Sequence, residues 1–421
     1  MNSTIVAGSL PQRNPFRAIA KTYQLAINSW LLIPAILFYH EVSRYLANIP
    51  IMDDFNMPLE FVMNFSKADL WSKLGMIFGQ YSEHRLVPSK LIYLSYYYLT
   101  GGMNFRIIGF IGNLQLLVVA FSGIHFIRKY IPQSWRLLAF IWMLIVFDLN
   151  TYENAAMCMN AVGNYGVICY FFASLYFYDK GGKWLTVAIL FQFFCIFSNG
   201  NGLAAGVFIV LFNISTSRRR LIISAIASCV LIGLYFIDYH TVTKPNHLPF
   251  DINILAVFFV RQSGAYFSFD NSFVIGLILL ILLPFLFPWK RLMDTKFYPI
   301  LCIFLFALST MVLTAIFRSC YSDAQFQTSR YLMYPQMVIG CLCTFVWMKL
   351  RSNRQKWIGG AVMLGIVFVA YACNCEYGKL GFERTNHRAA SRKFWHPNPA
   401  SCEKICKEAC ELGVYCIEDN R

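Results

Sequence analysis

Charged side chains are scarce in this sequence, and acidic ones are the scarcest. Asp, Glu, Lys and Arg make up 14% of the 421 residues, against about 25% in an ordinary soluble domain. Hydrophobic residues make up 57%, and they are gathered in blocks of roughly 15 to 22 residues, close to the length that crosses about 30 Å of hydrocarbon. The composition therefore excludes a water-soluble protein with one core and indicates a polytopic α-helical membrane protein.

The sequence also argues against two other classes, outer-membrane barrels and nucleic-acid-binding proteins. Ten-residue segments of alternating polar and apolar residues, typical of outer-membrane barrels, are absent, and the run at 275–287 would place apolar side chains on both faces of a strand. The formal net charge is +15, but the 36 Lys and Arg lie in small groups between the apolar blocks. We interpret them as topology signals, and no nucleic-acid partner is expected.

Eleven apolar blocks are interpreted as membrane spans. They cover residues 23–40, 107–127, 134–148, 161–178, 184–199, 202–216, 220–238, 272–289, 297–317, 331–348 and 357–373. The positive-inside rule assigns the alternate loops that hold the Lys and Arg groups to the cytoplasm. Of the 21 Asp and Glu residues, only Asp179 and Asp294 fall on that side. We therefore expect an all-α bundle of about eleven spans, with a cytoplasmic N-terminus and an external C-terminus.

Two further apolar stretches, 86–101 and 252–268, are interpreted as juxtamembrane or re-entrant helices on the outer face. The first is short and rich in Tyr, which favours the membrane interface. The second carries Arg261 and Gln262 in the middle of its run. Counting either one alone as a span would move the later basic loops to the wrong side of the membrane.

Three segments follow from this topology. They are a cytoplasmic segment at 1–22, a transmembrane domain at 23–373 with a long first external loop at 41–106, and an external tail at 374–421. No cleavable signal peptide is evident, so the first helix is expected to act as a start-transfer anchor.

Five polar clusters lie close to the membrane plane, where ionisable groups are costly unless they serve a function. They are Asp53-Asp54, Ser82-Glu83-His84-Arg85, Tyr152-Glu153-Asn154, Asn199-Gly200-Asn201-Gly202 and Ser329-Arg330-Tyr331. The topology, which rests on cations in the opposite loops, places all five at the outer face. We therefore expect one polar site at the outer mouth of the bundle.

The first two clusters carry groups that suit acid–base and phosphate chemistry. Asp53 and Asp54 could act as a general base with an orienting partner, or bind a divalent cation; the alternative is a solvated turn. Glu83, His84 and Arg85 offer a carboxylate, an imidazole and a guanidinium within one turn, and an Arg beside a His suits a phosphate diester. The alternative is an ion-pair network that anchors the interfacial helix.

The remaining clusters suit the binding of an anion and of hydroxyl groups. Arg330 opens a helix from its outer end, where the guanidinium and the helix N-terminus both attract an anion; the alternative is snorkelling to lipid headgroups. Glu153, Asn199 and Asn201 lie in short loops, where turn formation is the first role of such residues. The two Asn side chains could also hydrogen-bond a polyol.

Cysteines are concentrated in the tail. Six of the 14 lie at or beyond the last membrane boundary: Cys373, Cys375, Cys402, Cys406, Cys410 and Cys416. An oxidising external compartment favours disulfides, whose connectivity stays open. The alternative is a zinc site, because cysteines recur every four residues from 402 to 410 with His387 and His396 nearby. We expect the tail to be a small, stapled cap over the outer mouth.

The order of these features resembles the GT-C superfamily of integral-membrane glycosyltransferases. A first helix precedes a long external loop that opens with Asp-Asp, then an aromatic, Pro-containing helix ending in Thr-Gly-Gly, then the second span. The segments SEHRLVP, YEN, NGNGL and SRY, which begin at residues 82, 152, 199 and 329, are similar to those of bacterial members that use polyprenyl-phosphate sugars, including serotype-converting O-antigen glucosyltransferases. The resemblance covers 23–372, and the Cys-rich tail has no counterpart in it.

The resemblance implies an inverting transfer of a sugar, expected to be glucose, from undecaprenyl phosphate to a hydroxyl of a lipid-linked O-antigen or similar glycan. The reaction would take place on the periplasmic face of a bacterial inner membrane. The base would be Asp53 or Asp54, and two adjacent Asp residues in place of one separated acid leave that choice open. Arg330, with Arg85 and His84, would stabilise the leaving phosphate.

The resemblance also implies orienting residues and partners. The residues that would orient the acceptor or the cations are Glu83, Glu153, Asn154, Asn199, Asn201 and Tyr331. The partners would be the polyprenyl-phosphate-linked donor, the lipid-linked glycan acceptor, membrane lipids and a small flippase that supplies the donor. A divalent metal is left open as a cofactor.

Three other functions are weighed against this one. A lipid-glycan flippase would carry charges along a route through the bundle, whereas here they collect at one mouth. An O-antigen polymerase would carry its large external loop in the middle of the chain, whereas the longest loop here is the first. An O-acyltransferase would need a catalytic His, for which His84 or His40 would serve, but no acyl-carrier signature accompanies them.

Overall fold

The structure, a computed structural model, describes residues 28–241, 251–292, 294–319, 326, 328–390 and 398–417. Over these residues it contains helices and no strands, which confirms the all-α prediction. The predicted cytoplasmic segment 1–22 lies outside the described residues.

Seventeen α-helices are described, joined by loops, by short 3-10 turns and, at Phe55–Glu60, by a π-helical turn. They are α2 (Ile33–Tyr45), α3 (Phe61–Lys67), α4 (Leu70–Phe78), α5 (Val87–Thr100), α6 (Phe105–Tyr130), α7 (Trp135–Val146), α8 (Tyr152–Ala156), α9 (Cys158–Lys180), α10 (Leu185–Ile196), α11 (Asn201–Ile214), α12 (Arg218–Tyr235), α13 (Ile252–Gly264), α14 (Ser272–Leu286), α15 (Tyr298–Arg318), α16 (Met333–Lys349), α17 (Asn353–Ala390) and α18 (Pro399–Glu411).

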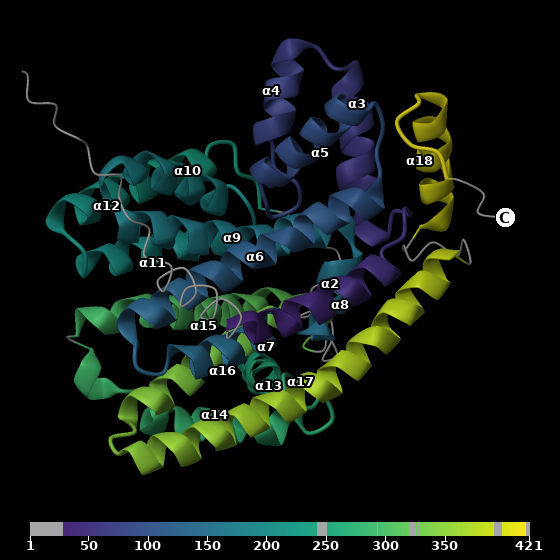
Figure 1. The fold of residues 1–421 in the computed structure, drawn as a ribbon. Coiled ribbons are helices and arrows are strands. Elements are labelled where there is room, and N and C mark those ends of the chain that lie inside the picture. The colour runs from purple at the N-terminus through teal and green to yellow at the C-terminus, as the bar shows by residue number, and fades with distance from the viewer. Residues whose placement is uncertain are drawn as a thin grey trace, which may run out of the picture.

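Six helical segments among the described residues are long and apolar enough to cross a membrane. They are Phe105–Tyr130, Trp135–Ala156, Cys158–Lys180, Thr295–Arg318, Ser329–Lys349 and Asn353–His387. In Figure 1, α6, α9 and α15 cross the middle of the molecule, and α17 runs obliquely along its lower edge. A membrane protein is therefore supported, and the finer count of eleven spans stays a prediction.

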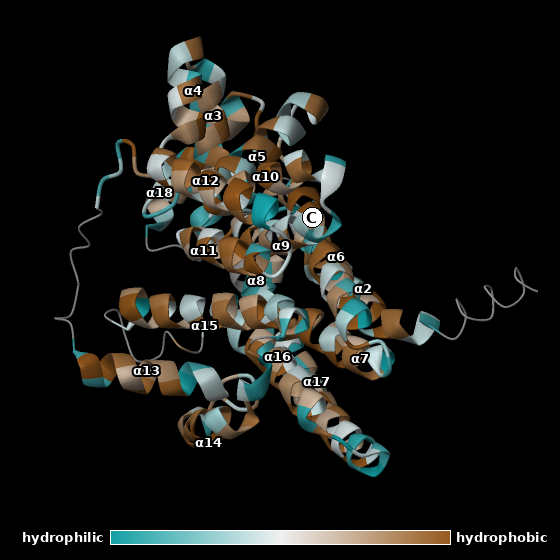
Figure 2. Ribbon diagram, turned by 90° about the vertical axis from the view of Figure 1, so that its left-hand side faces the viewer, coloured by the Kyte–Doolittle hydropathy of each residue, from teal (hydrophilic) through white to brown (hydrophobic). Residues whose placement is uncertain are grey.

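Several predicted spans coincide with helices shorter than a bilayer is thick. α10 has 12 residues, α11 has 14 and α14 has 15, so at 1.5 Å per residue none exceeds about 23 Å. Their outward sides are apolar: Phe273, Val274 and Ile278 of α14 are exposed, and α14 is mostly brown in Figure 2. Such surfaces suit contact with lipid rather than water.

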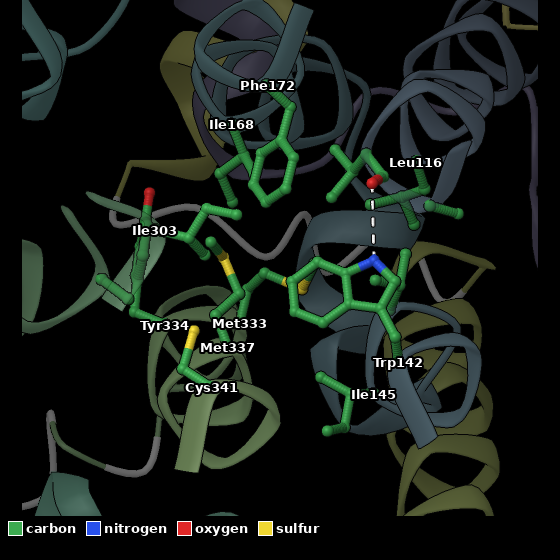
Figure 3. Packing of buried hydrophobic residues seen from close by; sticks show 14 of the residues in the cluster. Leu116, Trp142, Ile145, Ile168, Phe172, Ile303, Met333, Tyr334, Met337 and Cys341 are labelled. Carbon is green, nitrogen blue, oxygen red and sulfur yellow. Dashed lines mark hydrogen bonds between the residues drawn. The ribbon is translucent and has the colours of Figure 1, made fainter. Parts of the chain in front are cut away.

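α9 is the most enclosed of the long helices and forms the axis on which the others pack. Most of its side chains are buried, including Tyr165, Phe171 and Phe172. Around it, α7, α15 and α16 contribute Trp142, Ile303, Met337 and their neighbours to one continuous core, part of which is drawn in Figure 3. The Trp142 indole N–H donates to the carbonyl of Val119 at 3.5 Å, so its one polar atom is paired inside this core.

The first external loop folds into a separate layer on one side of the bundle. In Figure 1, α3, α4 and α5 are stacked there, and α18 lies next to them. Phe55 and Leu59 of the loop, Tyr93 of α5 and Cys402 of α18 share a second hydrophobic core. The predicted helix at 86–101 is present as α5. The predicted helix at 252–268 is present as α13, which ends at Gly264.

α17 runs without interruption past the predicted tail boundary at residue 374. It has 38 residues, about 57 Å at 1.5 Å per residue. The helix continues because its C-terminal half is packed: a Cβ added at Gly378 would lie 2.3 Å from the carbonyl oxygen of Leu149. The Asn374 amide also donates to the carboxylate of Asp148 at 3.0 Å. The first residues of the predicted tail are thus part of the bundle, as an extension of α17.

We predict that Gly378→Ala lowers the free energy of unfolding by about 1–3 kcal/mol, because the added methyl group forces α17 away from Leu149. The measurement is thermal unfolding of the purified protein in detergent. Gly365→Ala is the matched control, since no atom lies within 4 Å of a Cβ there and Ala favours a helix by up to about 1 kcal/mol over Gly. Equal effects of the two substitutions would contradict the close approach.

Candidate functional site

Two adjacent cavities lie at one end of the bundle and share a wall. One has a volume of about 480 Å³ and the other about 380 Å³. Seven residues line both cavities: Glu83, His84, Asn164, Asn199, Arg318, Arg330 and Tyr331. The larger continues between apolar side chains such as Leu313 and Phe317, whereas the smaller continues past Asp53 and Ser82. We call them the apolar and the polar cavity.

The five polar clusters, far apart in the sequence, come together around these cavities. Asp53, Glu83, Asn199 and Arg330 line one or both of them, and each belongs to a different cluster. Glu153, from the fifth cluster, lies behind the wall, where its carboxylate accepts the backbone N–H of Arg330 at 3.3 Å. The clusters therefore converge on one place, with Glu153 as a support rather than a lining residue.

The two adjacent aspartates occupy different environments. Asp53 lines the polar cavity with its side chain 45% exposed, and its carboxylate lies 3.9 Å from the Arg330 guanidinium. Asp54 is 1% exposed, and its carboxylate accepts backbone N–H groups from Ile51, Cys158 and Met159 at 3.1, 3.3 and 2.7 Å. Burial raises the pKa of Asp54 to about 7. Asp53 thus faces a cavity, whereas Asp54 holds the loop against α9.

Arg330 presents its guanidinium at the wall between the two cavities. Its backbone is held from α8, because the Asn154 amide donates to its carbonyl at 3.0 Å and Glu153 accepts its N–H. Its Nε is buried and has no hydrogen-bond partner among the described residues. A buried, unpaired donor of this kind is costly, and an anion in the cavities could satisfy it.

Arg85, expected as a second phosphate ligand, lines neither cavity. Its guanidinium donates to the carbonyls of Phe78, Tyr235 and Ile237. Lys90 acts in the same way, with its ammonium on the carbonyls of Met76, Ile77 and Gly79. The last carbonyls of a helix have no partner within the helix. Both cations donate to such carbonyls at the end of α4, and Arg85 also donates to those at the end of α12.

Arg318 is the cation that sequence reasoning missed. It ends α15 and lines both cavities, with its guanidinium 3.8 Å from the Glu83 carboxylate. The Tyr331 ring lies beside both arginines, with its centroid 6.0 Å from Cζ of Arg318 and 5.4 Å from Cζ of Arg330. The available signal was its position at the outer end of an apolar block, one residue beyond the predicted span at 297–317.

Three asparagine side chains form a hydrogen-bonded chain across the shared wall. The Asn199 amide donates to Asn164 at 2.8 Å, and the Asn164 amide donates to Asn154 at 2.9 Å. The Asn154 amide in turn reaches the carbonyl of Arg330. Asn164 was missed because it lies inside the apolar block at 161–178. The chain ties α8, α9 and the 199–202 turn to the arginine.

His84 and Asn201 hold the turn at 199–202 from its two sides. The backbone N–H of Gly200 donates to Nδ1 of His84 at 3.0 Å, so Nδ1 serves as an acceptor in this arrangement. The Asn201 amide donates to the hydroxyl of Tyr334 at 2.8 Å. His84 still lines both cavities, and Asn201 lines the apolar one.

The comparisons with known proteins do not place the chain in a family. No protein-family model matches it, and no curated protein matches it. The geometry of the two cavities is therefore the basis for a functional assignment.

The donor set does not indicate a resident metal. Among the described residues, no three His, Cys, Asp or Glu side chains are grouped as metal ligands. Asp53 is accompanied in the polar cavity by two arginines, and these cations would repel a divalent ion. The zinc alternative for the tail loses one of its ligands, because Cys410 is bonded to Cys416, and His396 lies outside the described residues.

Among the six cysteines at or beyond the last predicted boundary, the expectation of disulfides holds for one pair, and four are thiols. Cys410 and Cys416 are bonded, while Cys373, Cys375, Cys402 and Cys406 are free in the structure. The first two thiols lie on α17 instead of in a separate tail. Burial against the second core raises the pKa of Cys402 to about 11 and that of Cys406 to about 12, so both stay protonated at neutral pH.

We predict that Asp54→Asn removes part of the pH dependence of stability. The Asp54 pKa is 3.8 in the unfolded chain and about 7 in the folded one, so the folded state binds more protons between those values. The free energy of unfolding therefore falls as pH rises from about 4 to about 7. An amide cannot ionise, so thermal unfolding at pH 5 and pH 8 should differ less in the variant than in the wild type.

Asp53→Asn is the matched control for this experiment. Its carboxylate is half-exposed, and its charge is the last and smallest of the causes that shift the pKa of Asp54, so the variant should keep most of the wild-type difference between pH 5 and pH 8. A full wild-type difference in Asp54→Asn would show that Asp54 does not titrate in the folded state as proposed.

Proposed function

We propose that the protein is a glycosyltransferase that moves a sugar from a polyprenyl phosphate to a hydroxyl of a lipid-linked glycan at the outer membrane face. The observation that carries the proposal is the wall shared by an apolar and a polar cavity, which is built from two arginines and several hydrogen-bonding side chains. A donor of this class has the same order of parts: a long apolar chain, a phosphate and a sugar.

The apolar cavity suits the lipid portion of the donor. It is lined by Leu203 and Ala204 of α11, Leu313 and Phe317 of α15, and Phe236 just beyond α12. Phe236 and Phe317 are half-exposed, on helices whose neighbouring surface is also apolar. A prenyl chain could therefore enter from the bilayer without crossing a charged surface.

The two arginines at the shared wall suit the phosphate. Arg318 and Arg330 flank the ring of Tyr331. The Arg330 guanidinium lies 3.9 Å from the Asp53 carboxylate, beyond ordinary hydrogen-bond length, and its buried Nε has no hydrogen-bond partner among the described residues. A phosphate between them would offer shorter, charge-assisted bonds. It would also draw Arg330 away from Asp53 and leave that carboxylate free to act on the acceptor.

The proposed reaction is a single displacement at the anomeric carbon. Asp53 takes the proton of the acceptor hydroxyl, the hydroxyl oxygen bonds to C1 of the sugar, and the bond from C1 to the phosphate oxygen breaks with its electrons on the phosphate. The leaving phosphate gains one negative charge, which Arg318 and Arg330 stabilise. Attack from the face opposite the leaving group inverts the anomeric configuration.

The specific substrates follow from the resemblance alone. Undecaprenyl phosphate is the proposed carrier, glucose the proposed sugar, and an O-antigen or similar surface glycan the proposed acceptor. The proposed location is a bacterial inner membrane with the site on the periplasmic side, and a small flippase would supply the donor.

We predict that Asp53→Asn lowers kcat for sugar transfer by about 10²–10⁴, the usual contribution of a general base. The assay uses purified protein in detergent, synthetic polyprenyl-phosphate glucose and O-antigen glycolipid, and it records the gain of one hexose by mass. The control is Glu376→Gln, an exposed carboxylate outside the two cavities. Full activity of Asp53→Asn, or no transfer by the wild type with any offered glycan, would overturn the proposal.

We further predict that Arg318→Gln and Arg330→Gln each lower kcat by about 10²–10³, because each loses one cation at the developing phosphate charge. Arg351→Gln, an exposed cation on the opposite side of the predicted topology, should leave the rate unchanged. If Arg330→Gln lowers kcat and Arg318→Gln does not, Arg330 is a phosphate ligand and Arg318 is not.

A further inference from the structure

The C-terminal segment 399–417 contacts both ends of the first external loop. That loop leaves α2 after Tyr45 and rejoins the bundle at Phe105, where α6 begins. At its start, the Tyr415 hydroxyl donates to the carbonyl of Asn48 at 2.8 Å. At its end, the backbone N–H of Met103 donates to the carbonyl of Val414 at 2.7 Å. The two residues of the tail that make these bonds are neighbours in the chain.

The two ends of the loop are also joined to each other beneath the tail. The Asn48 side chain accepts the backbone N–H of Phe105 at 2.9 Å. The Tyr415 ring packs edge-on against Phe105, with the ring centroids 5.1 Å apart. Asn48, Phe105 and Tyr415 therefore form one closed contact, which fixes where the loop leaves the bundle and where it returns.

The middle of the loop is held by the same segment. Cys402, Cys406 and Ala409 on one face of α18 are buried in the second core with Phe55 and Leu59. Phe55 directly follows the Asp53-Asp54 pair in the sequence. At the edge of this contact, the Lys67 ammonium lies 2.8 Å from the Glu408 carboxylate, but this pair is half-exposed and adds little.

The disulfide gives the end of the tail its shape. Cys410 and Cys416 enclose a turn in which Gly413 has φ +67°, a conformation that costs other residues energy. The backbone N–H groups of Val414 and Tyr415 both donate to the carbonyl of Ala409, at 2.9 and 3.2 Å. The turn thereby directs Val414 and Tyr415 toward the two ends of the loop. A segment this short has little hydrophobic core of its own, so the disulfide and these hydrogen bonds fix its shape.

We propose that the segment 399–417, whose last turn is closed by the Cys410–Cys416 disulfide, is a positioning element that holds the first external loop so that Asp53 faces Arg330. The tail does not touch the reacting groups; it acts through the loop, which near Asp53 is also attached by the Asp54 carboxylate to the N–H groups of Cys158 and Met159. The kinetic part of the proposal rests on the proposed transferase activity, and the structural part does not.

The decisive variant is Cys410→Ser with Cys416→Ser in the full chain, with Cys373→Ser as the matched control because that thiol is free and exposed on α17. Hydrogen exchange of the purified proteins in detergent is followed by mass spectrometry. Without the bridge, the amide of Met103 should exchange at least about tenfold faster, and so should the remote amide of Met159, whose acceptor is on the loop. The control should match the wild type.

Kinetics separate positioning from a loss of folding. The double variant should lose about tenfold in kcat, because a displaced base slows the chemical step, with an unchanged KM for the donor, whose cavity the tail does not line. Dithiothreitol should reproduce this loss in the wild type and do nothing further to the double variant. Tyr415→Phe removes only the hydroxyl bond to Asn48 and should give a smaller change in the same direction.

The outcomes distinguish the two proposals. Unchanged exchange at Met159 in the double variant, or an unchanged kcat in an active enzyme, overturns the positioning role. Faster exchange at Met103 and Met159 in a protein whose wild type transfers no sugar supports the attachment of the loop by the tail and overturns the proposed reaction instead.

Discussion

The attachment of the first external loop to α9 is the contact on which the site depends. The Asp54 carboxylate accepts the N–H groups of Cys158 and Met159, which belong to the first turn of α9 and have no acceptor within the helix. One buried side chain thus satisfies a helix end and pins the loop to the most enclosed helix of the bundle. Because Asp53 is its neighbour, the same contact presents a second carboxylate to Arg330.

The two cavities combine environments that rarely lie side by side. A bilayer protein has ample apolar surface, but a cluster of ionisable groups at the membrane boundary needs compensation. Here each charge has a partner: Arg318 has Glu83 and Arg330 has Asp53, and the asparagine chain supports the wall from behind. In the proposed function, an anionic headgroup would compete with Asp53 for Arg330, whose pair is 3.9 Å long, beside the apolar cavity.

Much of the candidate site could be predicted from the sequence, because polar residues stand out against apolar blocks. That contrast located Asp53, Glu83, Asn199 and Arg330, and the counting of cations placed them at one face. It could not separate Arg85 from Arg318. Both are arginines near the ends of helices. The guanidinium of Arg85, however, donates to a backbone carbonyl of α12, about 150 residues away in the chain.

The sequence determined that this chain is helical and suited to a membrane, because long apolar blocks must satisfy their backbone hydrogen bonds internally where no water is present. Only the tertiary structure decided which of two adjacent aspartates faces a cavity, which arginines line the cavities, and where the disulfide-closed tail packs. Those outcomes depend on burial and on partners from distant segments, such as Asp54 with Met159 and Tyr415 with Asn48, which no local pattern records.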